Sequence, residues 1–448
     1  MIAAADTLCF SKTGRKSWGQ FAADIGMLRD RISGATHVCN LLPDRYHFMV
    51  GLAAAMLNDQ TTVLPAAAAP GAIRAALAGA DRPLVLGGEP RHHGSFDSLV
   101  DIPQSNAPAD PANTFSALAA SDTEVHVFTS GTTKVPERRI KDWKTLVGGA
   151  AVTQEILDKL DIRRGTAAIL GTTPHQHMYG LEATVFLGLG FGQSIYSSTV
   201  FYPADIDAAI SDAVACGFDK AVLVTSPAHL KFLEPTLLER REICAVISAT
   251  APLPDAQAGR LEARGSLAVM EIYGSTETGS LAIRRTIEGN AWEPVAGFRL
   301  VETDNGALAS APHLAEECLL GDTVELLDDG RFRLLGRTGD MIGIAGKRAN
   351  LSALNAILVE TPCLLDGVVL RERGEGDDRL AIVAVIDPDS GLSAAEGKAA
   401  IRTQFREHVD TVFLPRRIVF TDRLPRTPTG KIDADGIAEL LQLARARP

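Results

Sequence analysis

This sequence has fewer basic than acidic residues, no apolar run long enough to span a membrane, and no signal-peptide pattern in its first residues. The 448 residues include 44 Lys and Arg against 55 Asp and Glu, which gives a net charge of −11 at pH 7. This balance disfavours non-specific binding to nucleic acid. The best membrane-span candidate, residues 49–57, is interrupted at Asn58 and is shorter than the roughly 18 apolar residues that a span needs. Because no basic stretch followed by an apolar run begins the chain, we expect no signal peptide and a cytoplasmic protein.

The cysteines predict reduced thiols rather than disulfides or a metal site. No two of the six have C-x-x-C spacing, and most have apolar neighbours in the sequence. Thiols of this kind usually pack as small apolar side chains. None has the setting of a catalytic nucleophile, which would be the alternative use. The six are Cys9, Cys39, Cys216, Cys244, Cys318 and Cys363.

The sequence does contain a regular alternation of short apolar runs and helical patterns. Hydrophobic residues make up 46% and charged residues 22%, as in ordinary globular proteins. Residues 18–33 and 46–58 have the spacing of helices, and the apolar runs end in turn signals. The predicted strands are 37–42, 61–64, 84–86, 125–129, 167–170, 194–196, 221–225, 245–248 and 269–273. This order predicts an α/β fold of mixed, mostly parallel sheets covered by helices.

A change in composition near residue 337 predicts a second domain. Residues 336–346 are dense in glycine and short polar residues, as expected for a hinge. The predicted elements beyond them are helices at 352–360 and 393–409 and strands at 367–371, 380–386 and 417–420. We therefore expect a large core at 1–336 and a small, mobile α+β lid at 337–448. Residues 102–122, rich in Pro, Ala and short polar residues, are predicted to be a surface connector.

Three phrases carry residue types suited to phosphate chemistry. In T-S-G-T-T at 129–133, a glycine and hydroxyls follow a predicted strand and could hold phosphate oxygens. The phrase is not a Walker loop, because G-x-x-x-x-G-K-[ST] is absent. In Y-G-S-T-E at 273–277, a carboxylate ends a strand and could hold Mg²⁺ on ATP. Each could also be an ordinary polar turn. Near the C-terminus, Lys431 follows a glycine turn, and a site that used it would need the tail to fold over the core.

Together these phrases resemble the adenylate-forming superfamily of acyl-CoA and aryl-CoA ligases, peptide-synthetase adenylation domains and luciferases. They occur in the family's order over about two thirds of the chain. The resemblance implies an enzyme that activates a carboxylic acid with ATP and Mg²⁺ and passes the acyl group to a phosphopantetheine thiol. The matching phrases are T-S-G-T-T at 129–133, P-x-x-H-x-x-G at 174–180, S-x-x-A-P-L at 248–253, Y-G-S-T-E at 273–277, G-D at 321–322, G-R at 336–337 and P-R-T-P-T-G-K at 425–431.

The resemblance also implies roles for individual residues. Catalysis would use Lys431, bridging the α-phosphate and the attacking carboxylate, together with His177, Thr276 at the α-phosphate and Glu277 on Mg²⁺. Such groups stabilise the charged transition state. The implied ATP-binding residues are Thr129, Ser130, Gly131, Thr132 and Thr133 around the phosphates, Ala249, Thr250, Ala251 and Tyr273 at the adenine, Gly274 and Ser275 beside it, and Asp322 and Arg337 at the ribose. The acid would contact His175, His177, Met178, Tyr179, Gly180, Ala249 and Gly274.

The sequence departs from the family's pattern at several places, including the two loops expected at the nucleotide. Glu137 stands where the front loop usually has a lysine, and Lys134, Arg138, Arg139 or Lys141 could replace that charge. In the adenine loop, Ala249-Thr250 stands where two glycines are common. We therefore expect the negative charge of the phosphates to be neutralised by other residues than in most relatives.

The nature of the acid and of the acceptor is predicted from finer features. Two histidines and a tyrosine in 173–180 suit a flat acid with a polar edge, although His175 and His177 could instead form only structural hydrogen bonds. The short chain and its 347–351 phrase resemble ligases of aryl-polyene and xanthomonadin-type pigment pathways, which load a hydroxybenzoate-like acid onto an acyl carrier protein. Basic docking candidates for an acidic carrier are Lys347, Arg348, Arg416 and Arg417. The alternatives are a ligase that uses free CoA, a non-catalytic nucleotide or adenylate sensor, and, disfavoured by the missing phrases, a kinase or ATPase.

Overall fold

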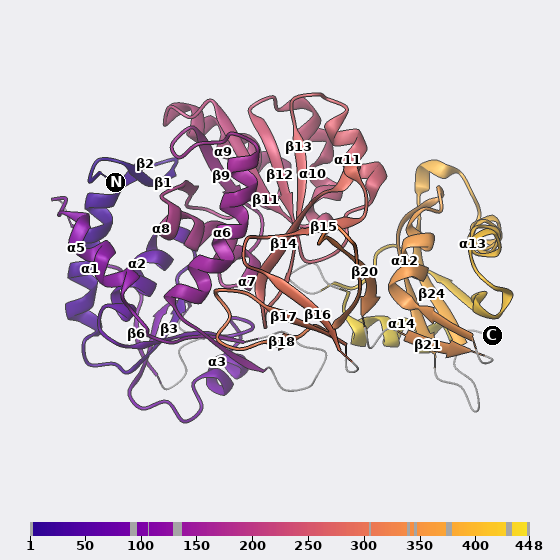
Figure 1. The fold of residues 1–448 in the computed structure, drawn as a ribbon, viewed down its shortest axis with the longest axis horizontal. Coiled ribbons are helices and arrows are strands. Elements are labelled where there is room, and N and C mark those ends of the chain that lie inside the picture. The colour runs from indigo at the N-terminus through magenta and orange to yellow at the C-terminus, as the bar shows by residue number, and fades with distance from the viewer. Residues whose placement is uncertain are drawn as a thin grey trace. The chain divides into compact units, whose positions relative to one another are not determined.

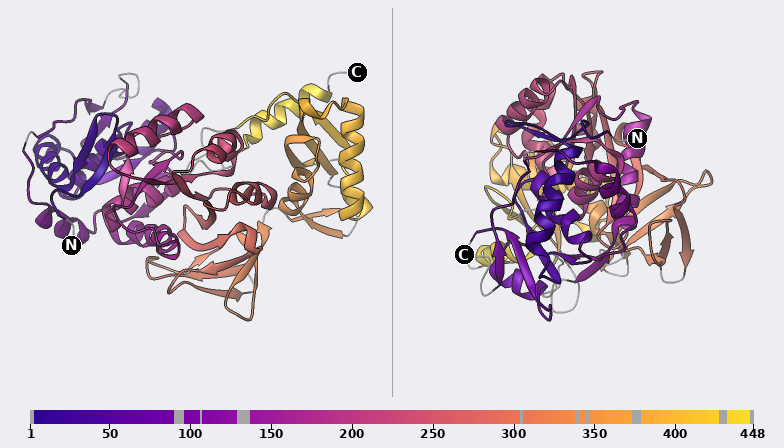
Figure 2. Two further views of the ribbon diagram at one scale, coloured as in Figure 1. Left: turned by 90° about the horizontal axis from the view of Figure 1, so that it is seen from above. Right: turned by 90° about the vertical axis from the view of Figure 1, so that its left-hand side faces the viewer.

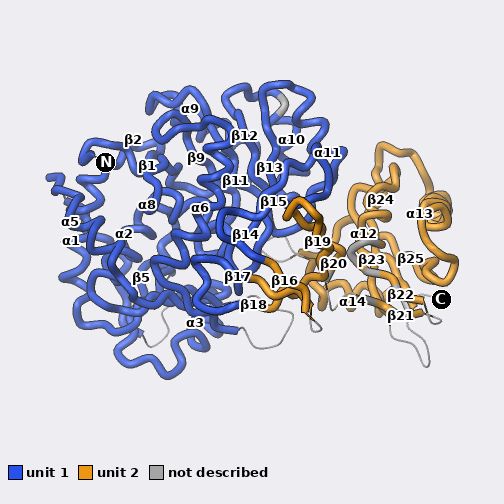
Figure 3. Tube along the Cα trace, viewed as in Figure 1, with its two compact units in different colours: residues 1–299, 310–318 blue, residues 300–309, 319–448 orange. Residues whose placement is uncertain are grey.

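The computed structural model divides the chain into two compact units (Figures 1 and 3). Unit 1 contains residues 1–299 and 310–318, and unit 2 contains residues 300–309 and 319–448. The residues that the structure describes are 3–89, 96–105, 107–128, 137–303, 306–337, 341–344, 347–372, 379–426 and 432–445. The sequence predicts a hinge near residue 337 that separates a core from a mobile lid. This boundary and the motion stay predictions.

Unit 1 contains two sheets. In the smaller sheet the strand order is β6 (Asp97–Leu99), β5 (Pro83–Gly87), β3 (His37–Leu41), β4 (Thr61–Leu64), β7 (Val125–Phe128) and β8 (Arg138–Lys141). In the larger sheet the strands of unit 1 follow the order β15 (Ala291–Pro294), β14 (Gly279–Arg285), β13 (Ala268–Ser275), β12 (Ile243–Ser248), β11 (Lys220–Thr225), β9 (Ala167–Gly171), β10 (Ser194–Tyr196), β1 (Thr7–Ser11) and β2 (Gly14–Ser17). Strands β10, β9, β11, β12 and β13 are parallel to one another.

Helices cover both faces of these parallel strands (Figures 1 and 2). The helices of unit 1 are α1 (Trp18–Ile32), α2 (Arg45–Met56), α3 (Pro70–Ala76), α5 (Pro111–Ala119), α6 (Trp143–Lys159), α7 (Met178–Gly180), the π-helix η1 (Leu181–Phe186), α8 (Leu187–Phe191), α9 (Pro203–Ala215), α10 (Pro227–Glu239), α11 (Asp255–Glu262) and the 3₁₀ turn η2 (Thr286–Glu288). On one face, Leu170, Leu223 and Val246 share a core with α9, α10 and α11. The residues between them, such as Ile169 and Val224, are also fully buried, as expected for strands covered on both faces.

Helix α1 illustrates how the sequence sets a boundary. Ser17 accepts a hydrogen bond from the backbone N–H of Gln20, whose side chain in turn accepts from the N–H of Ser17, so the capping box fixes the first turn. Phe21, Ile25 and Leu28 follow at helical spacing, and each is at most 1% exposed. The helix predicted at 18–33 is therefore confirmed.

The connector predicted at 102–122 is wrong for its second half, which contains α5. Asp110 caps this helix by accepting from the N–H of Ala112 at 3.0 Å, and Pro111 occupies the first turn. Phe115 packs edge-on against Trp18 and Trp143, with ring centroids 6.0 and 6.3 Å away. The Asp-Pro pair was the signal for this helix, and the surrounding Pro, Ala and Asn obscured it.

Unit 2 has its own sheet and core. Strands β23 (Leu364–Glu372), β24 (Arg379–Ile386) and β25 (Arg417–Phe420) form a sheet, and α12 (Leu351–Val359) and α13 (Ala394–His408) pack with it around Leu358, Ile382 and Phe405. These elements agree with the prediction. Further elements of this unit are β19 (Asp322–Leu326), β20 (Phe332–Arg337), β21 (Met341–Ile344), β22 (Lys347–Asn350), η4 (Pro388–Ser390), η5 (Thr411–Phe413) and α14 (Ala434–Arg445). The chain crosses between the units within β16 (Arg299–Thr303), β17 (Gly306–Ser310) and β18 (Cys318–Leu319).

The α/β class predicted from the sequence is confirmed, with a mixed sheet in unit 1 and a smaller α+β arrangement in unit 2. Every strand predicted before residue 300 overlaps a strand of the structure. Among the described residues, no helix has the length and apolar character that crossing a bilayer would require.

Candidate active site

The carboxyl ends of the parallel strands bring three predicted segments of unit 1 to one edge of the sheet. In the register of the strands, Gly171 lies opposite Val224, Thr225 opposite Ser248, and Ser248 opposite Glu271. The chain leaves these strands into the acid segment 174–180, the adenine loop 249–251 and the turn 274–277. Ligands of open α/β sheets bind at this kind of edge. The predicted segments are therefore neighbours although almost 100 residues separate the first from the last.

The turn after β13 is closed by its own hydroxyls. The hydroxyl oxygens of Ser275 and Thr278 lie 3.0 Å apart. Each hydroxyl also accepts a hydrogen bond from the backbone N–H of the other residue, at 3.1 and 3.2 Å. A side chain at Gly274 would collide with the carbonyl oxygen of Gly279 across the hairpin, so only glycine fits there. This turn presents Thr276 and Glu277 with both side chains half-buried.

Glu277 has the properties of a cation-binding carboxylate. Burial alone would raise its pKa, but hydrogen bonds from the turn and the charge of Arg139 hold the pKa below its ordinary value. Arg139 donates to Glu277 at 3.2 Å and to Glu137 at 2.6 Å, so it bridges the two carboxylates. One ionised carboxylate beside hydroxyls fits Mg²⁺, which prefers one or two carboxylates together with phosphate oxygens. Within the described ranges, no cluster of three or more His, Cys, Asp or Glu could hold a metal ion. A cation at Glu277 would therefore need phosphate oxygens as further ligands.

The adenine loop carries an unusual backbone. Thr250 has a φ of +81°, a conformation that glycine adopts readily and a threonine rarely does. Ala249 donates its N–H to the carbonyl of Thr225 at 3.3 Å, which anchors the loop to β11. Beside it, Tyr273 packs on Trp292 at a centroid distance of 5.7 Å, and the Arg284 guanidinium covers Trp292 at 4.7 Å. Trp292 is a support for Tyr273 that no sequence motif indicated.

In the acid segment, two of the predicted substrate residues act as scaffold. His175 is 2% exposed and donates from Nε2 to the carbonyl of Leu42 at 2.9 Å, with Phe48 packed edge-on at 4.6 Å. Tyr179 is buried and donates its hydroxyl to the carbonyl of Ile247 at 2.7 Å, and burial raises its pKa. These contacts favour the structural alternative that the sequence left open for His175. Met178 and Gly180 are buried as well, whereas His177 is half-buried.

Burial of His175 should make folding stability depend on pH. Burial lowers its pKa to about 3, with a further contribution from Arg45, whereas an unfolded histidine titrates near 6.5. A depressed folded pKa gives stability that is complete above pH 6.5 and is lost as the pH falls from 6.5 towards 3. Between pH 7 and pH 4 we expect this histidine to cost roughly 3 kcal/mol of unfolding free energy.

The measurement is urea unfolding of the wild type and His175→Gln between pH 7 and pH 4. The glutamine amide can still donate to Leu42 but does not titrate, so the variant should lose less stability on acidification. Parallel pH profiles would show that His175 does not carry this dependence.

A buried arginine orders the entry to the acid segment. Arg45 is 0% exposed and donates to the carbonyls of Gly171 at 3.1 Å and Thr173 at 3.0 Å. It also donates to the Ser198 carbonyl at 2.8 Å and to the Thr184 hydroxyl at 3.1 Å. Sequence reasoning missed this residue, because an arginine at the start of a helix carries no motif.

The remaining predicted residues belong to unit 2 or lie outside the described residues. Asp322 and Arg337 are register partners at one end of the β19–β20 hairpin, so the two predicted ribose residues lie together. The front-loop residues Thr129, Ser130, Gly131, Thr132 and Thr133 and the predicted catalytic Lys431 lie outside the described residues. Their roles stay predictions.

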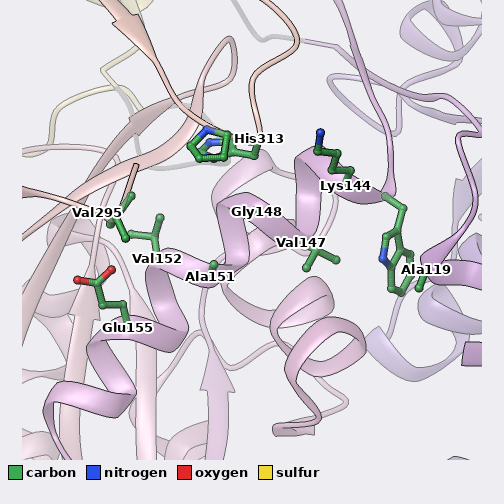
Figure 4. Close-up of a pocket in the computed structure, with 12 residues that line it drawn as sticks. Ala119, Lys144, Val147, Gly148, Ala151, Val152, Glu155, Val295 and His313 are labelled. Carbon is green, nitrogen blue, oxygen red and sulfur yellow. The ribbon is translucent and has the colours of Figure 1, made fainter. Parts of the chain in front are cut away.

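A groove of about 440 Å³ lies along α6 (Figure 4). Trp143, Lys144, Val147 and Glu155 line it from the helix, and His313 lines it from the chain segment after β17. None of the predicted site residues lines this groove. It is therefore not the predicted acid or nucleotide site.

Comparison with known proteins relates the chain to CoA ligases. No family model matches it. The 4-coumarate–CoA ligase of Rhodobacter capsulatus is 27% identical over 333 residues, which cover 71% of this chain and 77% of that protein. The probable CoA ligase CCL9 of Humulus lupulus is 23% identical over 425 residues, which cover 84% of this chain and 74% of that protein. A linear gramicidin synthase of Brevibacillus parabrevis is 35% identical over 127 residues, or 28% of this chain, and the chain spans only 2% of its length.

Solved structures share the fold at low sequence identity. ATP-bound MatB from Rhodopseudomonas palustris superposes with a TM-score of 0.79 and 17% identity, covering 97% of this chain and 96% of that chain. A benzoate CoA ligase from Burkholderia xenovorans LB400 gives a TM-score of 0.77 and 17% identity, covering 97% of each chain. The fold of this chain is therefore that of the adenylate-forming ligases, and it is similar in sequence to CoA ligases over most of its length.

Proposed function

We propose that this protein is an AMP-forming acid–thiol ligase. It would join a carboxylic acid to AMP, release pyrophosphate, and then transfer the acyl group to a phosphopantetheine thiol. The observation that carries the proposal is the carboxyl edge of unit 1, where segments 174–180, 249–251 and 273–277 lie on neighbouring strands. The similarity in sequence to CoA ligases over most of the chain supports the same activity.

In the first step a carboxylate oxygen attacks the α-phosphorus of ATP, and the bond to the oxygen that leads to the β-phosphate breaks. His177, half-buried in the acid segment, orients the carboxylate, while Thr276 hydrogen-bonds the α-phosphate. Lys431 neutralises the two anions that must meet, which is the main barrier to their reaction. Glu277 would hold Mg²⁺, which when bound would supply further positive charge to the phosphate oxygens. In the second step the thiol sulfur attacks the acyl carbon and AMP leaves.

We infer that the acid is aromatic and resembles a hydroxybenzoate. Ligases named for 4-coumarate and benzoate appear among the relatives in sequence and structure, and an anthranilate CoA ligase shares the fold. In the acid segment of this chain, His175 and Tyr179 are buried and donate hydrogen bonds to main-chain carbonyls. These bonds make the segment rigid. A stiff wall of this kind suits a flat ring better than a flexible alkyl chain.

We propose an acyl carrier protein as acceptor, with free CoA as the alternative. The docking residues predicted from the sequence are partly engaged elsewhere, because Lys347 pairs with Asp410 and Arg417 pairs with Glu372 at 2.9 Å. Arg416 is exposed. A carrier that docks here would therefore meet fewer available charges than the sequence suggested.

The test is a panel of acids assayed for pyrophosphate and AMP in the presence of ATP and Mg²⁺. We expect hydroxybenzoates to give the highest rates, above benzoate and above a medium-chain fatty acid, and no AMP without an acid. Formation of ADP instead of AMP would support a kinase or ATPase. Binding of ATP without turnover of any acid would support the sensor. Supplying CoA and a phosphopantetheinylated carrier protein in separate reactions identifies the acceptor.

A further inference from the structure

Three buried side chains, from β8, from η1 and from the chain segment after β17, hold the turn that carries Glu277. Lys141, at the end of β8, donates from Nζ to the carbonyl of Glu277 at 2.7 Å. Glu182, in η1, accepts from the N–H of Ser280 at 3.0 Å and from its hydroxyl at 2.7 Å. His313 Nε2 lies 3.3 Å from the carbonyl of Thr278. All of these residues belong to unit 1, and their contacts run from Glu277 to the strand that follows the turn.

Two glycines of the surrounding main chain leave the space that the Glu182 carboxylate occupies. A side chain at Gly149 of α6 or at Gly279 of β14 would overlap the Glu182 carboxylate. Glu182 is 1% exposed and lies in a π-helical turn, a geometry frequent at functional sites. That turn begins directly after Gly180, where the acid segment ends. Glu182 therefore connects the acid segment to the β13–β14 hairpin.

Lys141 and Glu182 are buried opposite charges that attract each other. Lys141 is 5% exposed, and burial lowers its pKa against the attraction of Glu182 and Glu277. Burial raises the pKa of Glu182 to about 7, against hydrogen bonds from Ser280 and the charge of Lys141. No described residue donates a hydrogen bond to the second carboxylate oxygen of Glu182. Because burying two charges is costly and an apolar pair of similar volume would often be at least as stable, a role besides stability accounts for them better.

We propose that Lys141 and Glu182 are positioning residues for adenylation, which hold the turn so that Thr276 and Glu277 face the phosphates. This inference rests on the proposed function. Lys141 fixes the turn at the carbonyl of Glu277 itself, and Glu182 fixes the strand that returns from it. Misplacement of a catalytic group by about 1 Å can cost on the order of 10²-fold in rate. Thiolysis of a preformed acyl-adenylate does not require charge to be neutralised on the β- and γ-phosphates, so it should depend on the pair much less.

The test compares Lys141→Met, Glu182→Leu and the double variant with the wild type. Each single variant leaves one buried charge without its partner, so each should lower both the melting temperature and the adenylation kcat. In the double variant both charges are gone, and the melting temperature should recover in part. Recovery is incomplete because the Glu277 carbonyl and the Ser280 N–H and hydroxyl still lack these partners. Its adenylation kcat should stay about 10²-fold below the wild type. Its rate of thiolysis with supplied acyl-adenylate should remain close to that of the wild type.

Asp24→Asn serves as the matched control. Asp24 is a carboxylate in α1, 1% exposed, that accepts from the Tyr46 hydroxyl at 2.6 Å and contacts no predicted site residue. This variant should lose melting temperature without losing adenylation kcat below its unfolding transition. Recovery of adenylation together with stability in the double variant would overturn the proposal, and so would equal loss of both half-reactions. If the wild type forms no AMP with any acid, the proposed function itself fails, which is a different result.

Discussion

Lys431→Ala is expected to abolish adenylation while thiolysis of a supplied acyl-adenylate persists. The first step brings a carboxylate anion to a polyphosphate, and the lysine would neutralise charge that develops only in that transition state. Loss of one such group typically costs about 10²–10³ in rate. In the second step the phosphate anhydride is already made, and the attacking group is a thiol. The lysine is therefore not needed there, and a lid that carries it can move away.

The two half-reactions are measured separately, by pyrophosphate release and by thioester formation from synthetic acyl-adenylate. Lys398→Ala is the control, since Lys398 lies on α13 of the same unit and has no predicted role. It should leave both rates near those of the wild type. Equal loss of both half-reactions in Lys431→Ala would contradict the idea that the lid adopts a separate position for each step.

Arg45→Met is expected to have the largest effect on stability. The guanidinium is 0% exposed and donates hydrogen bonds to several carbonyls and to one hydroxyl. The carbonyls include those of Gly171 and Thr173. Without it, the Thr173 carbonyl loses this donor, whereas the Gly171 carbonyl keeps the N–H of Val200 at 3.1 Å. Hydrogen bonds from a charged group are worth about 1.5–3 kcal/mol each, so the loss of several should cost roughly 3–5 kcal/mol of unfolding free energy.

Urea unfolding monitored by circular dichroism measures this loss. Arg45→Lys should recover little of it, because an ammonium cannot reproduce the planar fork that reaches several carbonyls at once. Arg163→Met is the matched control: its side chain is 79% exposed in a pair with Asp161, and it should change stability by less than about 0.5 kcal/mol. A small effect of Arg45→Met would mean that water or a shifted main chain satisfies the carbonyls.

The sequence predicted the sheet of unit 1 well because buried parallel strands leave a strong local signal. Runs such as 221–225 and 245–248 are apolar throughout and end in turn residues, so their position follows from composition alone. Helix α5 escaped prediction because its signal is a single Asp-Pro pair among turn-forming residues. The β21–β22 hairpin escaped as well, since each of its strands has only four residues. Helix α14, with 12 residues, was also not predicted.

The candidate site could be predicted where ligands constrain the sequence and not where packing does. Phrases such as Y-G-S-T-E are recognisable because the phosphate and cation binding predicted for them would require particular groups in a particular order. Lys141 and Glu182 belong to no such phrase, and only the three-dimensional structure shows that both hold the same turn. For His175 the sequence left open both contact with the acid and a structural hydrogen bond, and in the structure its ring donates to a main-chain carbonyl.

The closeness of Gly149 and Gly279 to Glu182 also constrains how this sequence can have evolved. The carboxylate occupies the volume that a side chain at either glycine would need. A side chain at either position would push the Glu182 carboxylate out of this place and away from Ser280. At Gly279 the positive φ of 69° favours glycine as well. Substitutions at these three positions, which are far apart in the chain, are therefore expected to depend on one another.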